Sequence, residues 1–582
     1  MSLILKSSKT NWKVRPAGSG VKEFARKLGS SSILAQVLLN RGIETVEQAR
    51  VFLSPKLTDL IEPERMPGVE AAVVRIRQAI ERSEPIVVYG DYDVDGITSV
   101  AILWHLLTML GGKVDFYIPH RIDEGYGVNA EAIRQIAETG AKLLVTVDCG
   151  ITAVEETLLA LQLGMDVVVT DHHQPHERLP EAAAIVHPRL DPTYPNPDSA
   201  GAMVAFKLAW AVVNSFKNGR RADEPLRNFL LNATTLAAMG TVADVVDLRG
   251  ENRILTHYGL KALPQSRQPG IRALIESAEL DSDTLDSYDI AFRLAPMLNA
   301  AGRMGHARLA VELLTCDNEL RCMQIARYLK DQNRRRQQCQ REIFQQARER
   351  IHAMGLDHPD RRTIVLADEG WHTGVIGIVA SRILEEYNRP AILINSGNGS
   401  GTAQGSGRSI DGFDIHQALS ACSQHLLSFG GHRKAAGLRL SPDKIADFAA
   451  AFEEHARTCL SEHRAVATIE IDAEYPIDQF GSDTVKELAR LEPFGQGNPK
   501  PVFATRGVRW IAPPRKVGQR GDHLQLAVTD HTASVRCIGF DMGRLEKKLL
   551  ESDCFSVAYE VQLDNYRGSD AIQFVLKEIQ FE

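Results

Sequence analysis

The chain has 582 residues, of which 44% are hydrophobic and 24% are charged, and its formal net charge is -7 at pH 7. A chain of this length can bury several hydrophobic cores, and the usual domain size predicts three or four domains. The negative net charge argues against a protein that coats nucleic acid nonspecifically, so a nucleic-acid partner must meet a local basic patch.

The eight cysteines are scattered and form no Cys-x-x-Cys pair. This usage is typical of reduced thiols in a cytosolic protein, and it argues against a disulfide framework or a zinc ribbon. Residues 1–16 lack the apolar core of a signal peptide, and no uncharged apolar stretch approaches the roughly 20 residues of a membrane span. We therefore expect a soluble, cytoplasmic enzyme with no membrane partner.

Residues 1–70 show short helical patterns at 32–39 and 46–53, after which Pro55, Pro63 and Pro67 break the chain. We interpret this region as a small cap that leads into the main domain. It offers no candidate chemistry.

From about residue 71 to 245, strand-like and helix-like stretches alternate. This alternation predicts a parallel sheet with helices on both faces, and ligands bind beyond the carboxyl ends of such strands. The predicted strands are 86–89, 113–118, 142–147, 166–170 and 184–187.

Residues 91–96 read Asp-Tyr-Asp-Val-Asp-Gly and follow the apolar run 86–89, and a helical pattern begins at Ile97. Three carboxylates spaced by two point the same way if the backbone stays extended, and their mutual repulsion then calls for a cation. An EF-hand loop is the alternative interpretation, but it needs a Glu at its twelfth position and a preceding helix. Here position twelve is Ile102 and the preceding run is strand-like.

The other predicted strands also end in polar residues, which places all of them at one edge of the sheet. Asp244 ends a helical stretch, and taken singly it is interpreted as an ordinary solvated residue at a helix end. A negative charge at a helix C-terminus is unfavourable, and a bound metal ion would offset that charge. The strand-end residues are Arg121 after the second strand, Asp148 after the third, Asp171, His172 and His173 after the fourth, and His187 and Arg189 after the fifth.

Residues 299–303 read as a small-residue turn that carries Arg303, and residues 318–354 read as one long helix. Between positions 321 and 350 this helix has nine Arg or Lys and three acids. The excess fits either a solvated linking helix or a surface that follows a phosphate backbone.

A second α/β pattern begins near residue 361, with strands at 363–367 and 391–395 around a helix at 374–387. Two glycine-rich stretches follow, 397–407 and 429–437. We interpret them as turns whose backbone N–H groups, beside His and Arg, suit an anion such as phosphate.

Residues 441–462 look helical, 465–471 look like a strand and 492–499 look like a linker. From residue 501 onward the chain is strand-rich, with cations among aromatic residues, and this favours a small β-barrel of the OB type that stacks bases. The alternative, for at least half of these aromatic residues, is that they pack in the core of the barrel. The aromatic residues are Phe503, Trp510, Phe555, Tyr559, Tyr566 and Phe574.

Together these motifs resemble the DHH phosphoesterase superfamily and, within it, the RecJ single-strand-specific exonucleases. The name-giving triplet stands at Asp171, His172 and His173, and the first motif at 91–96. Asp148 and Asp244 match the second and fourth motifs, and residues 406–409 and 429–437 match the companion DHHA1 domain. The resemblance runs from about residue 30 to the C-terminus.

The resemblance implies an α/β fold with two α/β lobes, DHH and DHHA1, joined by a long helix, with the active site in the groove between them and a C-terminal OB-type β-barrel. The implied domains are a cap at 1–70, a DHH domain at 71–317, a connecting helix at 318–356, a DHHA1 domain at 357–464, and a linker with an OB domain at 465–582.

By motif, the resemblance also implies two divalent cations, Mn2+ or Mg2+, held by Asp93, Asp95, Asp148, His172 and Asp244, with Asp148 as the bridge. Oxygen ligands with one imidazole suit these cations better than zinc. His173 is implied to contact the scissile phosphate or to protonate the leaving oxygen. Many sister enzymes have a histidine where this chain has Tyr89, and Asp91 lies nearby as a further candidate ligand.

The implied activity is a 5′ to 3′ exonuclease that is specific for single-stranded DNA, releases 5′ mononucleotides by two-metal hydrolysis and acts in DNA repair and recombination. The implied partners are single-stranded DNA, a single-strand-binding protein and a helicase. The candidate phosphate- or DNA-binding residues are Arg121, Arg303, Arg408, Ser409, Gly430, Gly431 and His432.

Two alternatives have different signatures. A phosphoesterase for short oligonucleotides or small phosphate esters needs neither the basic helix nor the C-terminal β domain. A non-catalytic single-strand-binding scaffold is expected to have lost ligands, yet all the candidate ligands are present.

Overall fold

The structure is a computed structural model that describes residues 11–581 except 122–123, 126, 217–222, 282–283, 305, 398–400, 461–467 and 565–570. Its internal contacts divide the chain into two compact units. The first unit comprises residues 55–337 together with 493–499, and the second comprises residues 1–54, 338–492 and 500–582.

The first unit contains a five-stranded sheet in the order β3-β2-β4-β5-β6, and all its neighbouring strands are parallel. This confirms the predicted parallel sheet, and each predicted strand lies within one residue of the observed one. The strands are β2 (Pro85–Gly90), β3 (Lys113–Tyr117), β4 (Leu143–Val147), β5 (Asp166–Thr170) and β6 (Ala184–Val186).

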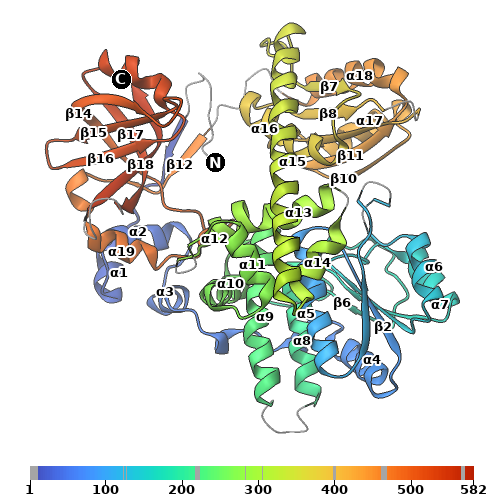
Figure 1. Ribbon diagram of the computed structural model, residues 1–582. Helices are drawn as coiled ribbons and strands as arrows, with labels where there is room; N and C mark the ends of the chain where they lie inside the picture. Colours follow the sequence, from blue (N-terminus) through green and yellow to red (C-terminus); the bar gives the residue numbers. More distant parts are fainter. Residues whose placement is uncertain are drawn as a thin grey trace. The chain divides into compact units, whose positions relative to one another are not determined.

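Helices cover both faces of this sheet (Figure 1). Successive strand side chains point to opposite faces, so Val88 and Val145 belong to one core while Val87 and Leu144 belong to another. The first core packs against α4, α5 and α8, and the second against α6 and α7. The helices are α4 (Val69–Glu81), α5 (Val94–Met109), α6 (Ala130–Glu138), α7 (Val154–Gln162) and α8 (Gly201–Phe216).

Further helices complete the first unit and enlarge the core on the α5 side. The predicted turn at residues 299–303 is wrong, because these residues are the last part of the helix α13. The small residues Ala300, Ala301 and Gly302 allow this helix to pack closely; a Cβ on Gly302 would lie 2.7 Å from the carbonyl oxygen of Tyr92. The helices are α9 (Glu224–Ala243), α10 (Gly250–Ala262), α11 (Pro269–Ser277), α12 (Ser287–Asp289), α13 (Ala295–Arg303) and α14 (Ala307–Thr315).

The predicted long helix is confirmed as α15 (Glu319–Ala353), which runs from the first unit into the second. Five of its nine cations lie within ion-pair distance of an acid, which favours a solvated, salt-bridged helix over a continuous phosphate-binding surface. The pairs are Arg321–Glu312, Lys330–Glu279, Arg334–Asp331, Arg348–Glu386 and Arg350–Asp368.

The second unit has a five-stranded sheet in the order β10-β11-β9-β8-β7. The glycine-rich stretches, predicted to be turns, lie largely in strands where the structure describes them: Gly405 and Gly407 lie in β9, and Gly430 pairs with Gly437 across a hairpin whose turn is at Arg433 and Lys434. Small residues are tolerated there because side chains from neighbouring strands fill the space above Gly405 and Gly407. The elements are β7 (Ile364–Asp368), α16 (Thr373–Tyr387), β8 (Ala391–Asn395), β9 (Ala403–Arg408), α17 (Ile415–Ala421), β10 (Ser428–His432), β11 (Ala435–Leu440) and α18 (Ile445–Cys459).

The C-terminal strands confirm the predicted barrel. Their order is β13-β14-β15-β16-β18-β17, and pairing of β14 with β17 closes the sheet. Phe503, Phe555, Tyr559 and Phe574 are fully buried inside it, so for these four the base-stacking prediction is wrong, and Tyr566 lies outside the described residues. The elements are β12 (Thr468–Ile471), β13 (Ala473–Glu474), α19 (Ser482–Ala489), β14 (Phe503–Val517), β15 (His523–Thr529), β16 (Ser534–Gly539), α20 (Glu546–Leu550), β17 (Phe555–Leu563) and β18 (Ile572–Phe581).

The N-terminal segment belongs to the second unit. β1 (Asn11–Val14) pairs in parallel with β12, and the side-chain amide of Asn40 donates to the carbonyl oxygen of Asp472 at 2.8 Å. Both predicted helices occur, as α2 and α3, and a third precedes them. The helices are α1 (Val21–Leu28), α2 (Ser32–Asn40) and α3 (Val46–Leu53).

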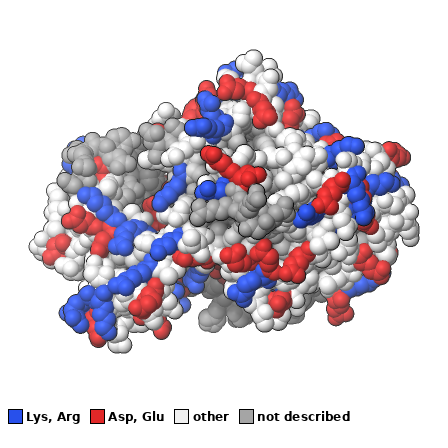
Figure 2. Space-filling view, turned by 90° about the horizontal axis from the view of Figure 1, so that it is seen from below, with Lys and Arg blue, Asp and Glu red and all other residues white. Residues whose placement is uncertain are grey.

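Among the described residues, no helix combines the length and the apolar character that crossing a membrane requires. On the face drawn in Figure 2, basic and acidic side chains are interspersed over most of the surface. A polyanionic ligand therefore has to be recognised by local sets of side chains.

Candidate metal centre

The candidate ligands lie at one edge of the parallel sheet of the first unit. β2, β4 and β5 are neighbours and run in the same direction, so the residues that follow them are brought together. Asp91 and Asp93 follow β2, Asp148 follows β4, and Asp171 follows β5. The predicted convergence of the strand ends is therefore confirmed.

The backbone through the first acidic motif differs from the extended loop predicted above. α5 begins at Val94, and Asp93 is its N-cap, whose carboxylate accepts hydrogen bonds from the N–H groups of Asp95 at 3.0 Å and Gly96 at 3.2 Å. An N-cap carboxylate satisfies donors that the helix leaves free, and it also neutralises the positive end of the helix dipole. The carboxylates therefore do not converge by strand alternation.

Asp95 instead points toward the N-terminus of α8. Its two carboxylate oxygens accept hydrogen bonds from the N–H groups of Gly201 at 2.6 Å and Ala202 at 2.8 Å. Burial, with the nearby charge of Asp93, raises the pKa of Asp95 to about 7. The approach is close, because a Cβ on Gly240 would lie 2.5 Å from a carboxylate oxygen of Asp95.

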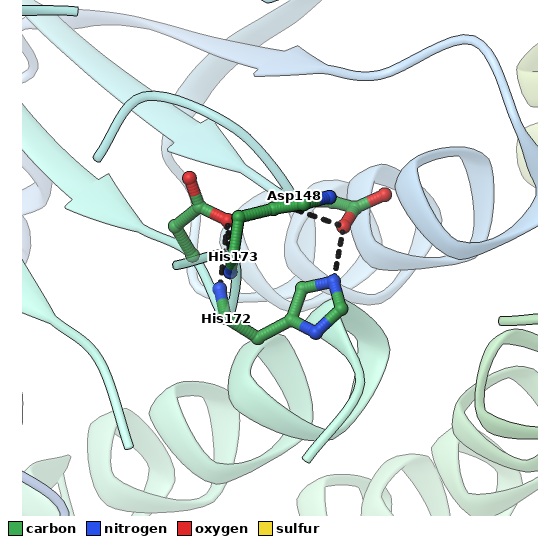
Figure 3. Close-up of side chains that lie close together, drawn as sticks. Asp148, His172 and His173 are labelled. Atoms are coloured by element: carbon green, nitrogen blue, oxygen red, sulfur yellow. Dashed lines mark hydrogen bonds and ion pairs between the residues drawn. The ribbon is translucent and has the colours of Figure 1, made fainter. Parts of the chain in front are cut away.

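Asp148 has a left-handed backbone conformation with φ 59°, which Asp tolerates better than most residues. Figure 3 shows His172 with its imidazole turned toward the Asp148 carboxylate. His172 Nε2 lies 3.0 Å from Asp148 Oδ1. Burial, together with the charge of Asp95, raises the pKa of Asp148 well above its usual range.

Asp171, the first residue of the triplet, organises the loop around the centre. Its Oδ1 accepts a hydrogen bond from His173 Nδ1 at 2.7 Å, and its Oδ2 accepts one from the N–H of Ile151 at 2.9 Å. Burial would raise the pKa of Asp171, but these hydrogen bonds hold it at about 2. Sequence reasoning did not assign this role, although the triplet itself marked the residue.

The same contact fixes the protonation of His173. Burial would lower the pKa of His173, but the hydrogen bond to the Asp171 carboxylate outweighs it and raises the pKa to about 9. Its backbone carbonyl also accepts a hydrogen bond from His187 Nε2 at 2.8 Å. His173 is therefore a cation near neutral pH with a fixed ring orientation.

His172 has the opposite character. Burial and the neighbouring His173 lower its pKa to about 3, so its ring is neutral near pH 7 and can offer a lone pair to a metal. Its Nε2 lies 3.7 Å from one carboxylate oxygen of Asp95 and 3.7 Å from one of Asp244.

Asp244 is the C-cap of α9, and its side chain is partly exposed. Burial and the charge of Asp95 raise its pKa to about 8. The helix C-terminus adds further negative potential. These conditions disfavour a bare carboxylate and favour a cation beside it.

The donor set fits a pair of hard divalent cations. Three buried atoms, Asp91 Oδ1, Asp148 Oδ1 and His172 Nε2, have no hydrogen-bond partner among the described residues, which is costly unless a cation binds them. The possible ligands form three overlapping groups, and within each group the ligand atoms lie within 4.8 Å of one another: Asp91, Asp93 and Asp148; Asp95, His172 and Asp244; and Asp148, Asp171, His172 and His173. In the last group Asp171 and His173 bind each other, so the first two groups are the candidate ligand sets. Because His172 Nε2 lies next to Asp148, that carboxylate lies between the groups, as a bridging ligand requires.

Tyr89 stands where many sister enzymes have a histidine, and its side chain points elsewhere. Its hydroxyl donates to the carbonyl oxygen of Gly127 at 2.9 Å, and its ring stacks on Tyr117. Asp91, which is 3% exposed, is the residue near this position that faces the acidic cluster.

Two of the candidate phosphate-binding residues are in the first unit. The Arg121 guanidinium lies 4.8 Å from the centre of the Tyr92 ring, and both Arg121 and Arg303 act electrostatically on the Tyr92 hydroxyl. Sequence reasoning missed Tyr92 because it stands between two acids of the motif, where a buried aromatic has no distinctive pattern.

The remaining candidates are in the second unit. Arg408 Nη1 donates to the Ser406 hydroxyl at 3.1 Å, whereas the Ser409 hydroxyl donates to the carbonyl oxygen of Phe413 at 2.7 Å and is buried. Gly430, Gly431 and His432 lie on β10, an edge strand, where part of the backbone remains unpaired. Ser409 thus has a role inside its own domain, while Ser406 lies beside the arginine.

Three domain families match the chain. The DHH family N-terminal domain matches residues 85–241, the DHHA1 domain matches 360–458, and the RecJ OB domain matches 471–578. The first match contains β2 to β6 and all the candidate ligands except Asp244.

Characterised relatives cover nearly the whole chain. The single-stranded-DNA-specific exonuclease RecJ of Bacillus subtilis is 37% identical over 98% of this chain and 71% of its own length, and that of Escherichia coli is 32% identical over 94% and 95%. A crystal structure of RecJ from Thermus thermophilus in complex with Mn2+ matches 99% of this chain and 80% of its own, with 30% identity and a TM-score of 0.84; one with Mg2+ gives 0.77. The chain therefore belongs to the RecJ family of single-stranded-DNA-specific exonucleases.

Proposed function

We propose that the chain is a metal-dependent 5′ to 3′ exonuclease that hydrolyses single-stranded DNA to 5′ mononucleotides in DNA repair and recombination. The observation that carries this proposal is the convergence at one edge of the sheet of three buried ligand atoms, on Asp91, Asp148 and His172, that have no hydrogen-bond partner among the described residues. Family membership supports the substrate and the use of Mn2+ or Mg2+, since relatives are named for this substrate and solved with these ions.

In this proposal the two groups of ligands hold two divalent cations, with Asp148 shared between them. When bound, the cations supply a water of lowered pKa and neutralise charge on the phosphodiester. The protein's own contribution is to hold the ligands in place: helix N-termini fix Asp93 and Asp95, and a left-handed backbone fixes Asp148.

His173 has a separate role. Its Nδ1 is engaged by Asp171, which keeps the ring oriented and its Nε2 protonated at neutral pH. A protonated Nε2 can donate a hydrogen bond to a phosphate oxygen or a proton to the leaving oxygen. Asp171 stays ionised throughout, so it acts as a positioning residue.

The preference for an end requires a group that recognises a terminal phosphate. Arg121 and Arg303 in the first unit are our proposed holders, because guanidinium groups bind phosphate oxygens in a bidentate manner. Arg408 in the second unit is a separate candidate for phosphate binding. Tyr92 supports Arg121 through the stacking described above.

The barrel offers a surface for longer strands. In the pairing of β14, β15 and β16, Arg515 is opposite Gln525 and Arg509 is opposite Thr529, and Arg536 is opposite Ala527. These outward positions carry three arginines, and none of them forms an ion pair with another described residue. Phe540, 46% exposed, follows β16 and contacts His523. Cations beside an exposed ring suit a single strand.

The decisive test is the release of nucleotides from single strands labelled at the 5′ or the 3′ end, with Mn2+ and with EDTA. We expect Mn2+-dependent release of the 5′ label as a mononucleotide and little cleavage of duplex. Release from the 3′ end first, or activity in EDTA, would contradict the proposal.

Substrate length separates this function from a phosphoesterase for short oligonucleotides. We expect the efficiency to rise from strands of a few nucleotides to long strands, because a longer strand offers more phosphates and bases to the barrel surface. Equal or higher efficiency on dinucleotides would favour the small-substrate enzyme.

We further propose a single-strand-binding protein and a helicase as partners, since a single-strand-specific exonuclease depends on strands that are opened and kept apart. Activity on duplex DNA in the presence of a helicase and a single-strand-binding protein tests this, and no stimulation would contradict it. We place the enzyme in the cytoplasm; all eight cysteines are free, which supports a reducing compartment.

A further inference from the structure

Residues 493–499 have a structural role that their composition conceals. The segment reads Pro-Phe-Gly-Gln-Gly-Asn-Pro, and its glycines and prolines predict a linker. In the structure it is a compact turn that belongs to the first unit, although the residues on both sides of it in the chain belong to the second. It is therefore held in place by contacts that a free linker lacks.

Hydrogen bonds within the segment itself stabilise the turn. Gly495 and Asn498 exchange two backbone hydrogen bonds, of 2.9 and 3.1 Å, and the side-chain amide of Asn498 donates to the carbonyl oxygen of Pro493 at 2.7 Å. Asn498 has 0% exposure. A fully buried amide that ties both ends of a seven-residue segment gives it one defined shape.

This turn binds the segment that immediately follows Asp244. The N–H of Leu248 donates to the carbonyl oxygen of Gln496 at 2.8 Å, and Arg249 Nε donates to that of Gly497 at 2.9 Å. Asn252, in the next helix, donates to the carbonyl oxygen of Asp247 at 3.0 Å. Residues 247–249 are thus held from both sides.

The two glycines of the turn lie against side chains of residues 247 and 248. A Cβ on Gly495 would lie 2.7 Å from Leu248 Cδ1, and Leu248 is 2% exposed. A Cβ on Gly497 would lie 2.6 Å from the carboxyl carbon of Asp247, and Gly497 has φ +69°, which favours glycine. At Gly497 the backbone conformation itself favours glycine, and a side chain at either glycine would displace the side chain of Asp247 or Leu248, about 250 positions earlier in the chain.

The backbone between Asp244 and this contact is strained. Val245 has φ 61°, a conformation that β-branched residues rarely adopt, and its side chain is 63% exposed, so packing of the side chain does not explain it. Strained backbone of this kind persists where the surroundings impose it, and it is concentrated at functional sites. The anchored segment 247–249 begins two residues after Val245.

We infer that residues 493–499 are a positioning element for the metal centre, which fixes the direction in which α9 presents the Asp244 carboxylate. This inference rests on the proposed function, because it takes Asp244 as a ligand. Support for a metal-ligating residue is typically worth ten- to a hundredfold in metal affinity. Loosening the turn therefore weakens the centre although no residue of the turn touches it.

The test is Gly497→Ala, with Gly164→Ala as the matched control. Gly164 also has a positive φ, +80°, but a Cβ there would meet nothing within 4 Å, so the control reproduces the backbone strain without the collision. We expect Gly497→Ala to weaken Mn2+ binding about tenfold by calorimetry. We also expect its loss of activity to be recovered at high Mn2+, while Gly164→Ala binds Mn2+ as the wild type does.

Ser287→Ala covers the case in which Gly497→Ala does not fold, because it only removes a hydroxyl that donates to the carbonyl oxygen of Phe494. It is expected to weaken Mn2+ binding in the same direction by a smaller factor. Unchanged Mn2+ affinity in a folded Gly497→Ala protein, or in Ser287→Ala if the former does not fold, would overturn the inference. Unchanged Mn2+ affinity in Asp244→Ala would instead overturn the assignment of Asp244, and with it this part of the proposed function.

Discussion

The metal centre and the C-terminal barrel bury polar and aromatic side chains in opposite ways. At the metal centre, Asp91 and Asp148 are 3% and 2% exposed and carry oxygens without hydrogen-bond partners. In the barrel, the hydroxyl of the equally buried Tyr559 is paired with Thr505 at 2.7 Å, and its ring stacks on Phe574. Several such ligand atoms clustered in one place indicate a site that needs a cation, whereas the satisfied hydroxyl of Tyr559 belongs to a core.

The same difference separates function from stability. The carboxylates of the metal centre repel one another and are desolvated, so they destabilise the metal-free fold, and metal binding offsets this. The aromatic residues of the barrel stabilise the fold directly, and its proposed ligand surface is left to the exposed arginines and Phe540 outside. The predictions below test this contrast.

The largest effect is expected from Asp148→Asn. We expect hydrolysis to fall by about 1000-fold or more, because a metal site contributes several kcal/mol of transition-state stabilisation. The thermal transition in EDTA is expected at or above that of the wild type, because the substitution removes a buried charge. Wild-type activity of this variant, or a marked loss of its stability in EDTA, would contradict the view that Asp148 serves metal binding and not the stability of the fold.

Tyr559→Ala is expected to show the reverse pattern. Truncation of a large buried aromatic costs about 3 to 5 kcal/mol of unfolding free energy, as measured by denaturant titration. Phe540→Ala is the matched control on the same barrel: its stability should change by less than about 0.5 kcal/mol, while binding of long single strands weakens. A stable Tyr559→Ala protein would show that this aromatic residue is not part of the core.

A double substitution, Arg515→Ser with Arg536→Ser, tests the outer face of the barrel. Each lost phosphate contact lowers the salt dependence of single-strand binding by about 0.7 in the log–log slope, so the slope should fall by about 1.4. Cleavage of trinucleotides, which offer few phosphates for binding, should change much less. An unchanged slope on long strands would remove this face from the proposal.

The smallest effect concerns pH. The folded pKa values of Asp95, Asp244 and His173, about 7, 8 and 9, lie above their ordinary values, so the stability linked to these groups is lost as the pH rises through those values. We expect the melting temperature in EDTA to fall by a few degrees between pH 6.5 and 9. Excess Mn2+ should largely remove this dependence, and calorimetry in buffers of different ionisation enthalpy should show that Mn2+ binding releases protons.

Local patterns predicted the secondary structure best where the pattern was strong. The apolar runs before Asp91, Asp148 and Asp171 are short and continuous, as buried parallel strands require, and all three strands occur where predicted. The glycine-rich stretches around Gly405 and Gly430 misled the analysis. Glycine is common in turns, but neighbouring side chains fill the space beside Gly405 and Gly407, and only the assembled sheet shows this.

The candidate site was also predicted correctly where local patterns decide the structure and wrongly where distant contacts do. Residue type and position after predicted strands were enough to bring Asp93, Asp148 and His172 together. How Asp95 reaches the site was predicted wrongly, because the N-terminus of α8, more than 100 residues later, supplies its hydrogen bonds. No local pattern encodes a partner at that distance.

The sequence by itself determined the parallel sheet, the long helix and the strand-rich C-terminal region, because these depend on local hydrophobic patterns and on residue type; the set of candidate ligands came from the family resemblance. Only the tertiary structure decided which polar atoms remain unpaired, which aromatic residues fill the barrel, and that residues 493–499 support the turn after Asp244. These depend on how segments far apart in the chain share space, and that is set by packing.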